Sequence, residues 1–344
     1  MDQRNRPAVC NAIGLIPDGG ATTTTSGELS CPPGEVRARI HNMADRQSVQ
    51  LDDGRRLDFV EFGDVLGVPS IYLHGTPGSA LEAAWMHEHA IAHGVRLVSI
   101  DRPGYQKSER SERLGPDETA RDVAQLARLL SLERYGVIGF SGGAGSALTT
   151  AATATDSVSI VHLGGGMGPL VPGAEKVMPV ARRVVFSLVG RSSKVSRPLI
   201  ALAMRRLSKT LRDKLKIPTL AALELLEGSS AGSQLMAAEC FVRSMDPEQL
   251  AAWVSEFADA PEELDAIIGD MASLSSPWSF ELSDLATPVE IWHGTADAAV
   301  PLPYALALSR SLPNARLHAL EGEGHFVFLT HADEVCASIR AAAN

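Results

Sequence analysis

Residues 139–143 read Gly-Phe-Ser-Gly-Gly, and this short stretch decides how the rest of the chain is interpreted. The apolar run 135–138 precedes it, and the small residues of 144–154 follow it in a helical pattern. The pattern predicts a strand that turns sharply into a helix, with Ser141 at the tip of the turn. Glycines two positions before and after the serine let the strand and the helix approach closely. Ser141 is therefore a candidate functional residue, and the alternative is a glycine-rich loop that only turns the chain.

Composition and charge exclude several classes of protein. The chain has 344 residues, enough for one large α/β domain with an insertion or for two domains. Its net charge of −10 argues against a nucleic-acid partner. It contains no run of roughly 18 apolar residues, so we expect no membrane span. Four widely separated cysteines lack the spacing of a structural zinc site and favour a reducing compartment or no role in disulfides: Cys10, Cys31, Cys240 and Cys336.

The first 42 residues differ in composition from the rest of the chain. They include four consecutive threonines at 22–25 and too few apolar residues to offset the entropy of ordering. We therefore expect 1–42 to be a disordered leader, with Met43 as an alternative start of the protein. The longest apolar run, 12–17, is interrupted by a glycine and is too short for a signal peptide, so a cytoplasmic location is expected.

The pattern of apolar residues predicts a doubly wound, mostly parallel α/β sheet. A hairpin opens it, because two alternating runs flank an Asp-Asp-Gly turn. The later strands lack alternation, as expected where helices cover both faces of a sheet. We expect strands at 48–51, 56–60, 70–73, 96–100, 136–138, 158–161, 288–292 and 316–320. We expect helices at 79–93, 117–132, 143–154, 302–312 and 331–343, with Asp117 as the N-cap of the second helix.

The alternation of strands and helices stops in the middle of the chain. From about 166 to 285 the periodicity is helical only, and strands resume afterwards. The sequence therefore predicts an α/β core formed by residues 43–165 and 286–344. An inserted helical cap is expected at 166–285.

Two further residues follow strand ends and complete a catalytic pattern with Ser141. A serine hydroxyl needs a base, normally histidine, and the histidine needs a carboxylate to fix its tautomer. Asp297 ends the turn His-Gly-Thr-Ala-Asp after one predicted strand, and His325 lies in Gly-Glu-Gly-His-Phe after the next. Asp284 and Glu290 are competing acids, but neither follows the end of a strand. The order serine, aspartate, histidine predicts a triad of Ser141, Asp297 and His325.

Four motifs in this order make the chain resemble the α/β-hydrolase fold superfamily over about residues 46–344. They are His-Gly-Thr-Pro-Gly at 74–78, Asp-Arg-Pro-Gly-Tyr at 101–105, the turn at 139–143, and the two turns that hold the acid and the histidine. Gln106 departs from the pattern, because relatives with the second motif often have glycine there.

The resemblance implies an oxyanion hole formed by the backbone amides of Thr76 and Gly142. Two fixed N–H groups facing the developing oxyanion contribute roughly 10²-fold or more each to the rate. The resemblance also implies that the cap covers the active site and that the reaction needs no cofactor and no metal. We expect His74, Asp101 and Arg102 to shape the loops rather than to react.

Three histidines of one predicted helix raise the alternative of a metal site. His89 and His93 are four residues apart, a spacing that suits a metal ion on one helix face. His87 lies nearby, but the sequence lacks the His-Glu-x-x-His motif. An exposed helix face is therefore the preferred interpretation for all three.

The motifs favour a serine hydrolase that cleaves an ester of a small, mainly apolar molecule. A carbon–carbon bond hydrolase acting on a β-diketone-like compound would use the same triad. An aminopeptidase would also need a cap carboxylate for the substrate ammonium, and Glu224, Glu227 and Glu239 are available. A non-catalytic protein that binds a small ligand on the same fold is the alternative from a different class.

Overall fold

The computed structural model describes residues 46–113, 115–168, 197–198, 200–202, 263–273 and 278–343. The expected leader at 1–42 lies outside these ranges, and so does most of the expected cap at 166–285. Both stay predictions. Within the cap range the structure describes one helix that matters below, α10 (Leu264–Ser273).

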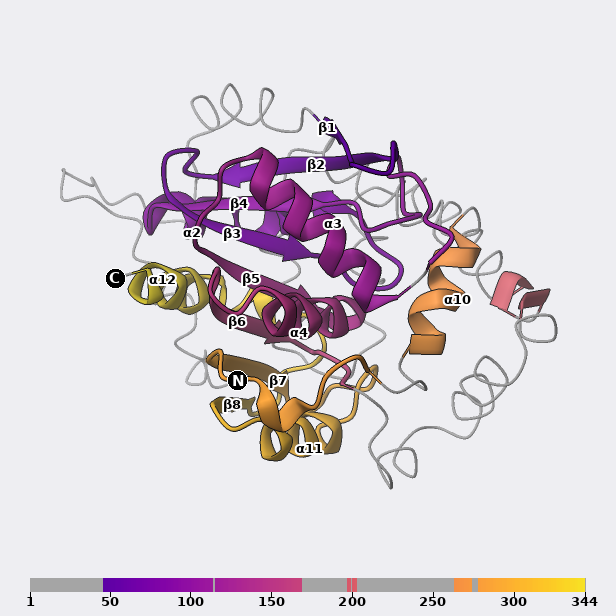
Figure 1. The fold of residues 1–344 in the computed structure, drawn as a ribbon. Helices are drawn as coiled ribbons and strands as arrows, with labels where there is room; N and C mark the ends of the chain where they lie inside the picture. Colours follow the sequence, from indigo (N-terminus) through magenta and orange to yellow (C-terminus); the bar gives the residue numbers. More distant parts are fainter. Residues whose placement is uncertain are drawn as a thin grey trace, which may run out of the picture.

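Eight strands form one sheet in the order β1-β2-β4-β3-β5-β6-β7-β8 (Figure 1). β2 pairs antiparallel with both β1 and β4, and every other neighbouring pair is parallel. The predicted fold class, a mostly parallel α/β sheet, is therefore confirmed. The bounds are β1 Gln47–Gln50, β2 Arg56–Gly63, β3 Val68–Leu73, β4 Val95–Ile100, β5 Tyr135–Phe140, β6 Val158–Gly164, β7 Val289–Gly294 and β8 Ala315–Leu320.

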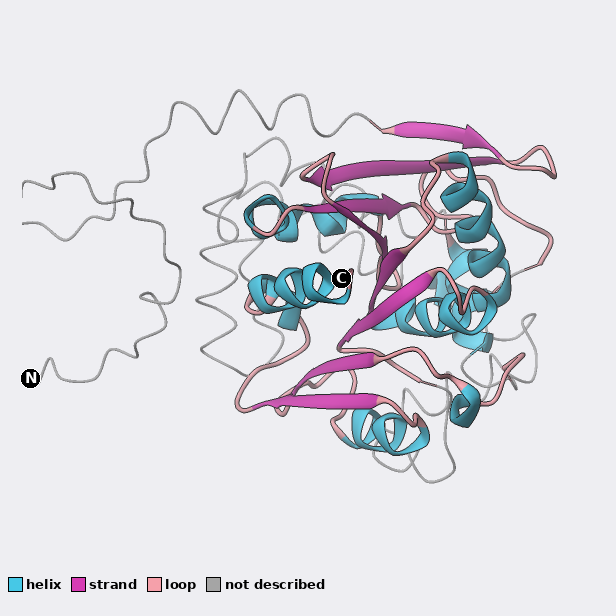
Figure 2. Cartoon of the chain, turned by 60° about the vertical axis from the view of Figure 1, so that its left-hand side comes forward, coloured by secondary structure: helices cyan, strands magenta, loops and turns pink. Residues whose placement is uncertain are grey.

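Helices cover both faces of the twisted sheet, as Figure 2 shows. One face packs against α3 (Pro116–Leu129), α4 (Ala144–Thr153) and α11 (Pro303–Ser311). The other face packs against η2 (Ala80–Met86), α2 (His87–Ala92) and α12 (Ala332–Ala342). Short 3-10 turns complete the described helices: η3 (Ser141–Gly143), η5 (Leu282–Asp284) and η6 (Val327–Leu329). None of the helices in the described ranges is long and apolar enough to cross a membrane.

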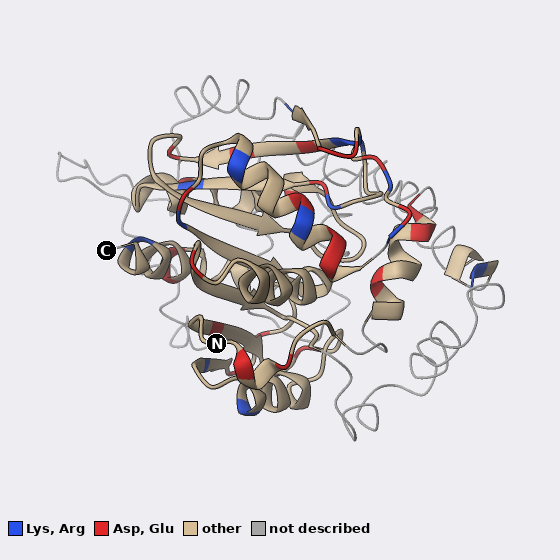
Figure 3. Cartoon of the chain, viewed as in Figure 1, with Lys and Arg blue, Asp and Glu red and all other residues tan. Residues whose placement is uncertain are grey.

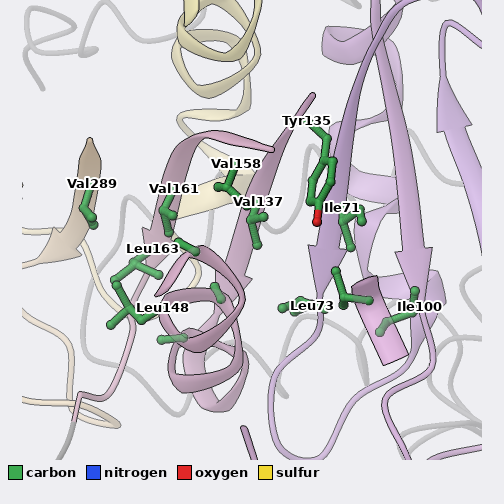
Figure 4. Close-up of a cluster of buried hydrophobic side chains, with 14 of the residues drawn as sticks. Ile71, Leu73, Ile100, Tyr135, Val137, Leu148, Val158, Val161, Leu163 and Val289 are labelled. Atoms are coloured by element: carbon green, nitrogen blue, oxygen red, sulfur yellow. The ribbon is translucent and has the colours of Figure 1, made fainter. Parts of the chain in front are cut away.

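The central strand β5 shows why alternation is absent from the sequence. All six of its residues are buried. Val137 joins the apolar cluster on one face, and Ile138 joins the cluster on the other. Leu148 of α4 reaches into the first cluster and has no exposed surface (Figure 4). Burial on both faces is the main stabilising contribution of this sheet.

The N-cap predicted for the second expected helix, which is α3 in the structure, is wrong. Gly115 occupies the N-cap with a φ of 108°, and Pro116 takes the first helical position. Proline is favoured there because its φ already suits the helix and its missing N–H leaves no unpaired donor. Asp117 lies in the first turn instead, where its charge is favourable beside the helix N-terminus.

We predict that Leu148→Ala lowers the free energy of unfolding by about 2–5 kcal/mol, because it leaves a cavity in the larger cluster. Leu66→Ala is the matched control, since Leu66 is 92% exposed, and its effect should stay within about 0.5 kcal/mol. Urea denaturation measures both. Similar losses for the two variants would contradict this description of the core.

Candidate active site

The turn that carries Ser141 is a strained junction between β5 and α4. Ser141 has a φ of 48°, in the left-handed region that residues other than glycine rarely adopt. The flanking glycines are required by close packing: a Cβ on Gly139 would lie 2.7 Å from the Cβ of Ala147. A Cβ on Gly143 would lie 2.2 Å from the carbonyl oxygen of Leu73. The structure thus has the sharp turn that the sequence predicts.

The structure brings Ser141, His325 and Asp297 into one hydrogen-bonded chain. His325 Nε2 lies 3.0 Å from Ser141 Oγ, and His325 Nδ1 lies 2.8 Å from Asp297 Oδ2. A carboxylate only accepts hydrogen bonds, so Nδ1 carries the proton and Nε2 is free to accept from the serine. The competing acid Glu290 pairs with His318 instead.

Asp297 is buried and remains ionised. Its Oδ1 accepts hydrogen bonds of 2.8 Å from the amides of Ala299 and Val300. Burial raises the pKa of Asp297, but the hydrogen bond and charge of His325 and the Val300 amide outweigh it, so the pKa is lowered. Burial also lowers the pKa of the neighbouring His293, which is therefore neutral near pH 7. The acid thus holds a negative charge against His325.

Thr76 and Gly142 lie in direct contact beside Ser141. A Cβ on Gly142 would lie 2.2 Å from Thr76 Oγ1 and 3.1 Å from the Thr76 nitrogen, so only glycine fits. Neither backbone amide donates to an acceptor within the ranges that the structure describes. Two neighbouring unpaired amides next to a serine can bind an oxyanion.

His74 connects the two loops that follow β3 and β4. Its Nε2 accepts from the Arg102 amide at 3.0 Å, and its Nδ1 donates to the Gly75 carbonyl oxygen at 2.8 Å. Burial lowers the pKa of His74 well below its ordinary value, which agrees with a neutral ring. Asp101 accepts from the Ala80 amide at 2.7 Å. These contacts hold the two loops in place, which is the role that the sequence led us to expect for His74 and Asp101.

Two acids that contact the 74–78 loop were not found from the sequence. Glu82 of η2 is buried, and its Oε1 accepts from the Gly75 amide and the Tyr72 hydroxyl, both at 3.0 Å. Asp270 of α10 accepts from the Thr76 hydroxyl at 2.6 Å. Neither acid belongs to a motif, and only the fold brings them to the loop.

The three histidines of α2 and its C-cap do not share one environment. His93 Nε2 and His89 Nδ1 lie 2.8 Å and 3.4 Å from Asp333, and both side chains are partly exposed. The exposed face expected for His87 is wrong, because this ring is buried and accepts from the Gly63 amide at 2.8 Å. Across the described residues, no group of three or more potential ligands could hold a metal ion.

Comparisons with known proteins agree with this fold. Residues 71–332 match the family model described as alpha/beta hydrolase fold. A relative from Pseudomonas putida, 2-hydroxy-6-oxononadienedioate/2-hydroxy-6-oxononatrienedioate hydrolase 2, is 28% identical over 276 residues, which cover 76% of this chain and 83% of the relative.

Two solved structures are similar in fold. An alpha/beta hydrolase fold protein from Nakamurella multipartita has a TM-score of 0.62 and 22% identity, covering 87% of this chain and 100% of that one. An esterase from Exiguobacterium antarcticum has a TM-score of 0.61 and 18% identity, covering 87% of this chain and 99% of that one. At these identities the likeness concerns the fold alone.

The burial of Glu82 makes folding depend on pH. Burial raises the pKa of Glu82 from 4.5 to about 8, so between these values the folded protein keeps a proton that the unfolded chain has released. The contribution of Glu82 to the free energy of unfolding therefore falls as the pH rises from about 4.5 to about 8.

We predict that Glu82→Gln removes this dependence, so the stability of the variant relative to wild type should rise across the same window. Urea denaturation of both proteins at several pH values between about 4.5 and about 8 measures the difference. A constant difference across the window would contradict the raised pKa.

Proposed function

Because the chain belongs to the α/β hydrolase fold family, we propose that it is a serine hydrolase that cleaves an ester through an acyl-enzyme on Ser141. The family match confirms the predicted class of enzyme, an α/β hydrolase. The observation that carries the proposal is the hydrogen-bonded chain from Asp297 through His325 to Ser141.

In the first step, Ser141 Oγ attacks the carbonyl carbon of the ester. His325 Nε2 takes the hydroxyl proton as the new bond forms. Asp297 keeps the proton on Nδ1 and stabilises the imidazolium by its charge. The lowered pKa of Asp297 supports this role, because the acid stays ionised while His325 is protonated.

The carbonyl oxygen becomes an oxyanion, and the amides of Thr76 and Gly142 bind it. The loss of one such donor typically lowers kcat by about 10²–10³-fold. The intermediate then collapses: the bond to the leaving alcohol breaks, and His325 gives the alcohol its proton. The acyl group stays on Ser141. Water activated by His325 attacks the acyl carbon, and the acid leaves as the serine recovers its proton.

Aromatic side chains beside His325 support an apolar substrate. The rings of Phe140 and Phe326 lie 5.1 Å and 5.5 Å from the His325 ring, measured between centroids. Trp85 packs on both phenylalanines, at 5.4 Å and 5.9 Å. Trp85 and Phe140 are buried in the core behind His325, where they strengthen the electrostatic interactions of the triad. Phe326 is partly exposed beside His325 and favours an apolar acyl group. A helical cap over the site would select the size of the substrate.

Hydrolysis of a carbon–carbon bond is the second candidate, and the Pseudomonas putida relative favours it, because the substrate in that protein's name is an oxo dienedioate, which has a ketone and no ester. In this chain Ser141 would attack a ketone carbon, and the electron pair of the broken bond would go to a carbon leaving group. That carbon would then take a proton. The glutamates of the aminopeptidase alternative, Glu224, Glu227 and Glu239, lie outside the described residues.

A panel of substrates tests the proposal. We expect turnover of p-nitrophenyl esters from acetate upward, with a clear optimum of chain length, and little turnover of a 2-hydroxy-6-oxo dienedioate. His325→Gln should lower kcat by about 10³-fold or more, because the base is lost. His93→Gln is the matched control and should leave kcat unchanged, since His93 contacts Asp333 on the surface.

Other outcomes separate the alternatives. Turnover of the dienedioate without turnover of esters would support the second candidate. Equal rates across the ester series would contradict the apolar specificity. Tight binding without turnover of either class would favour the non-catalytic ligand-binding protein.

A further inference from the structure

We infer that Asp270 of α10 is a positioning residue, which holds the Gly75–Thr76 peptide so that its amide faces the oxyanion at Ser141. The inference rests on the proposed function. It assigns a role in the reaction to a residue of the predicted cap range, which is distant in the sequence from Thr76, Arg102 and Tyr105, the residues that it contacts.

Asp270 is the centre of a compact network at the edge of the site. Its Oδ2 accepts three hydrogen bonds, from Thr76 Oγ1 at 2.6 Å, from Tyr105 Oη at 2.6 Å and from Arg102 Nη1 at 2.8 Å. The Arg102 side chain is 1% exposed and that of Asp270 is 15% exposed. A buried guanidinium needs such a partner, because an unpaired charge in this position would be costly.

Arg102 connects Asp270 to the 74–78 loop. Its Nη2 donates to the Gly75 carbonyl oxygen at 2.7 Å and to Thr76 Oγ1 at 2.8 Å. The single proton of the Thr76 hydroxyl is then directed to Asp270. The guanidinium also lies over the Tyr105 ring, 4.7 Å from its centroid, which fixes the plane of the group. The side chains of Asp270, Thr76 and Tyr105 thus fix the orientation of the Arg102 guanidinium.

Because the peptide bond is planar, fixing the direction of the Gly75 carbonyl also fixes the direction of the Thr76 N–H. The Gly75 carbonyl and the Thr76 N–H belong to one planar peptide unit, in which they point in opposite directions. Arg102 and His74 both donate to the carbonyl oxygen, so the N–H must point away from them. The Thr76 nitrogen lies on the side of Gly142. Two donors on the carbonyl also polarise the peptide and make its N–H a stronger donor.

A second contact ties the same segment to the neighbouring loop. Glu263, directly before α10, accepts from the Gln106 amide at 2.9 Å and from Gln106 Nε2 at 2.7 Å. Gln106 has a φ of 49°, in the left-handed region that favours glycine. In this chain the glutamine side chain adds a bond to Glu263. The segment 263–273 therefore contacts the 101–106 loop at two places.

Asp265 supplies a matched control on the same helix. Figure 3 shows the acidic residues of α10 in red. Asp265 forms ion pairs with Arg110 and Arg197, whereas Asp270 bonds to the loop beside Ser141. A substitution of either aspartate by asparagine removes one charge from α10, but only one of them touches Thr76.

The test compares Asp270→Asn, Asp265→Asn and wild type in the full chain. We expect Asp270→Asn to lower kcat for a p-nitrophenyl ester by about 10- to 100-fold, with KM changed less than about threefold, because the oxyanion amide is misaligned. A trifluoromethyl ketone, which adds to the serine and forms an oxyanion, should bind more weakly by a similar factor. Fluorine NMR of the adduct measures this binding. Asp265→Asn should match wild type, and thermal unfolding checks that each variant is folded.

Several results would overturn the inference. Unchanged kcat and ketone binding in folded Asp270→Asn would remove the positioning role, and a raised KM with normal kcat would make Asp270 a substrate-binding residue instead. If Asp270→Asn does not fold, Thr76→Val decides, because it removes only the hydroxyl that bonds to Asp270, and unchanged kcat in that variant contradicts the inference. Failure of the proposed function looks different: wild type itself would form no ketone adduct.

Discussion

The left-handed turn at Ser141 is the constraint on which the rest of this site depends. A φ of 48° at a serine costs on the order of 1–3 kcal/mol, so the surrounding packing must hold it. The packing is provided by α4, whose residues from Ala144 to Ala151 are all buried against the sheet. The turn lifts the serine hydroxyl out of the sheet at the ends of the parallel strands, where the loops after β7 and β8 also arrive.

The chemistry of the site depends on charges held in fixed directions. Asp297, kept ionised by its hydrogen bonds, orients the histidine that faces the serine. The 74–78 loop is held by hydrogen bonds from several sides. Glu82 accepts from the Gly75 amide, Arg102 donates to the Gly75 carbonyl, and Asp270 accepts from the Thr76 hydroxyl. A loop so fixed needs little reorganisation when an oxyanion forms, which is the basis of electrostatic catalysis.

The sheet could be predicted from sequence because its strands are buried on both faces and appear as apolar runs. All eight expected strands are present, and their ends move by only a few residues. The triad residues could be proposed because each follows a strand end. The roles of Glu82 and Asp270 could not be predicted, since a single acid in a helix has no sequence pattern. Asp270, for example, acquires its role from contacts with residues that are far away in the sequence. His87 was misjudged because helical spacing does not show which face of a short helix packs against Gly63.

The most direct test of the account is intact mass spectrometry after treatment with a fluorophosphonate, on wild type and on Ser141→Ala. A hydroxyl activated by His325 and lying beside the Thr76 and Gly142 amides should attack the phosphorus and displace fluoride. The account predicts one adduct per wild-type chain, located on Ser141 by peptide mapping, and none on the variant. Absence of the adduct from folded wild type, or an equal adduct on Ser141→Ala, would contradict an activated Ser141.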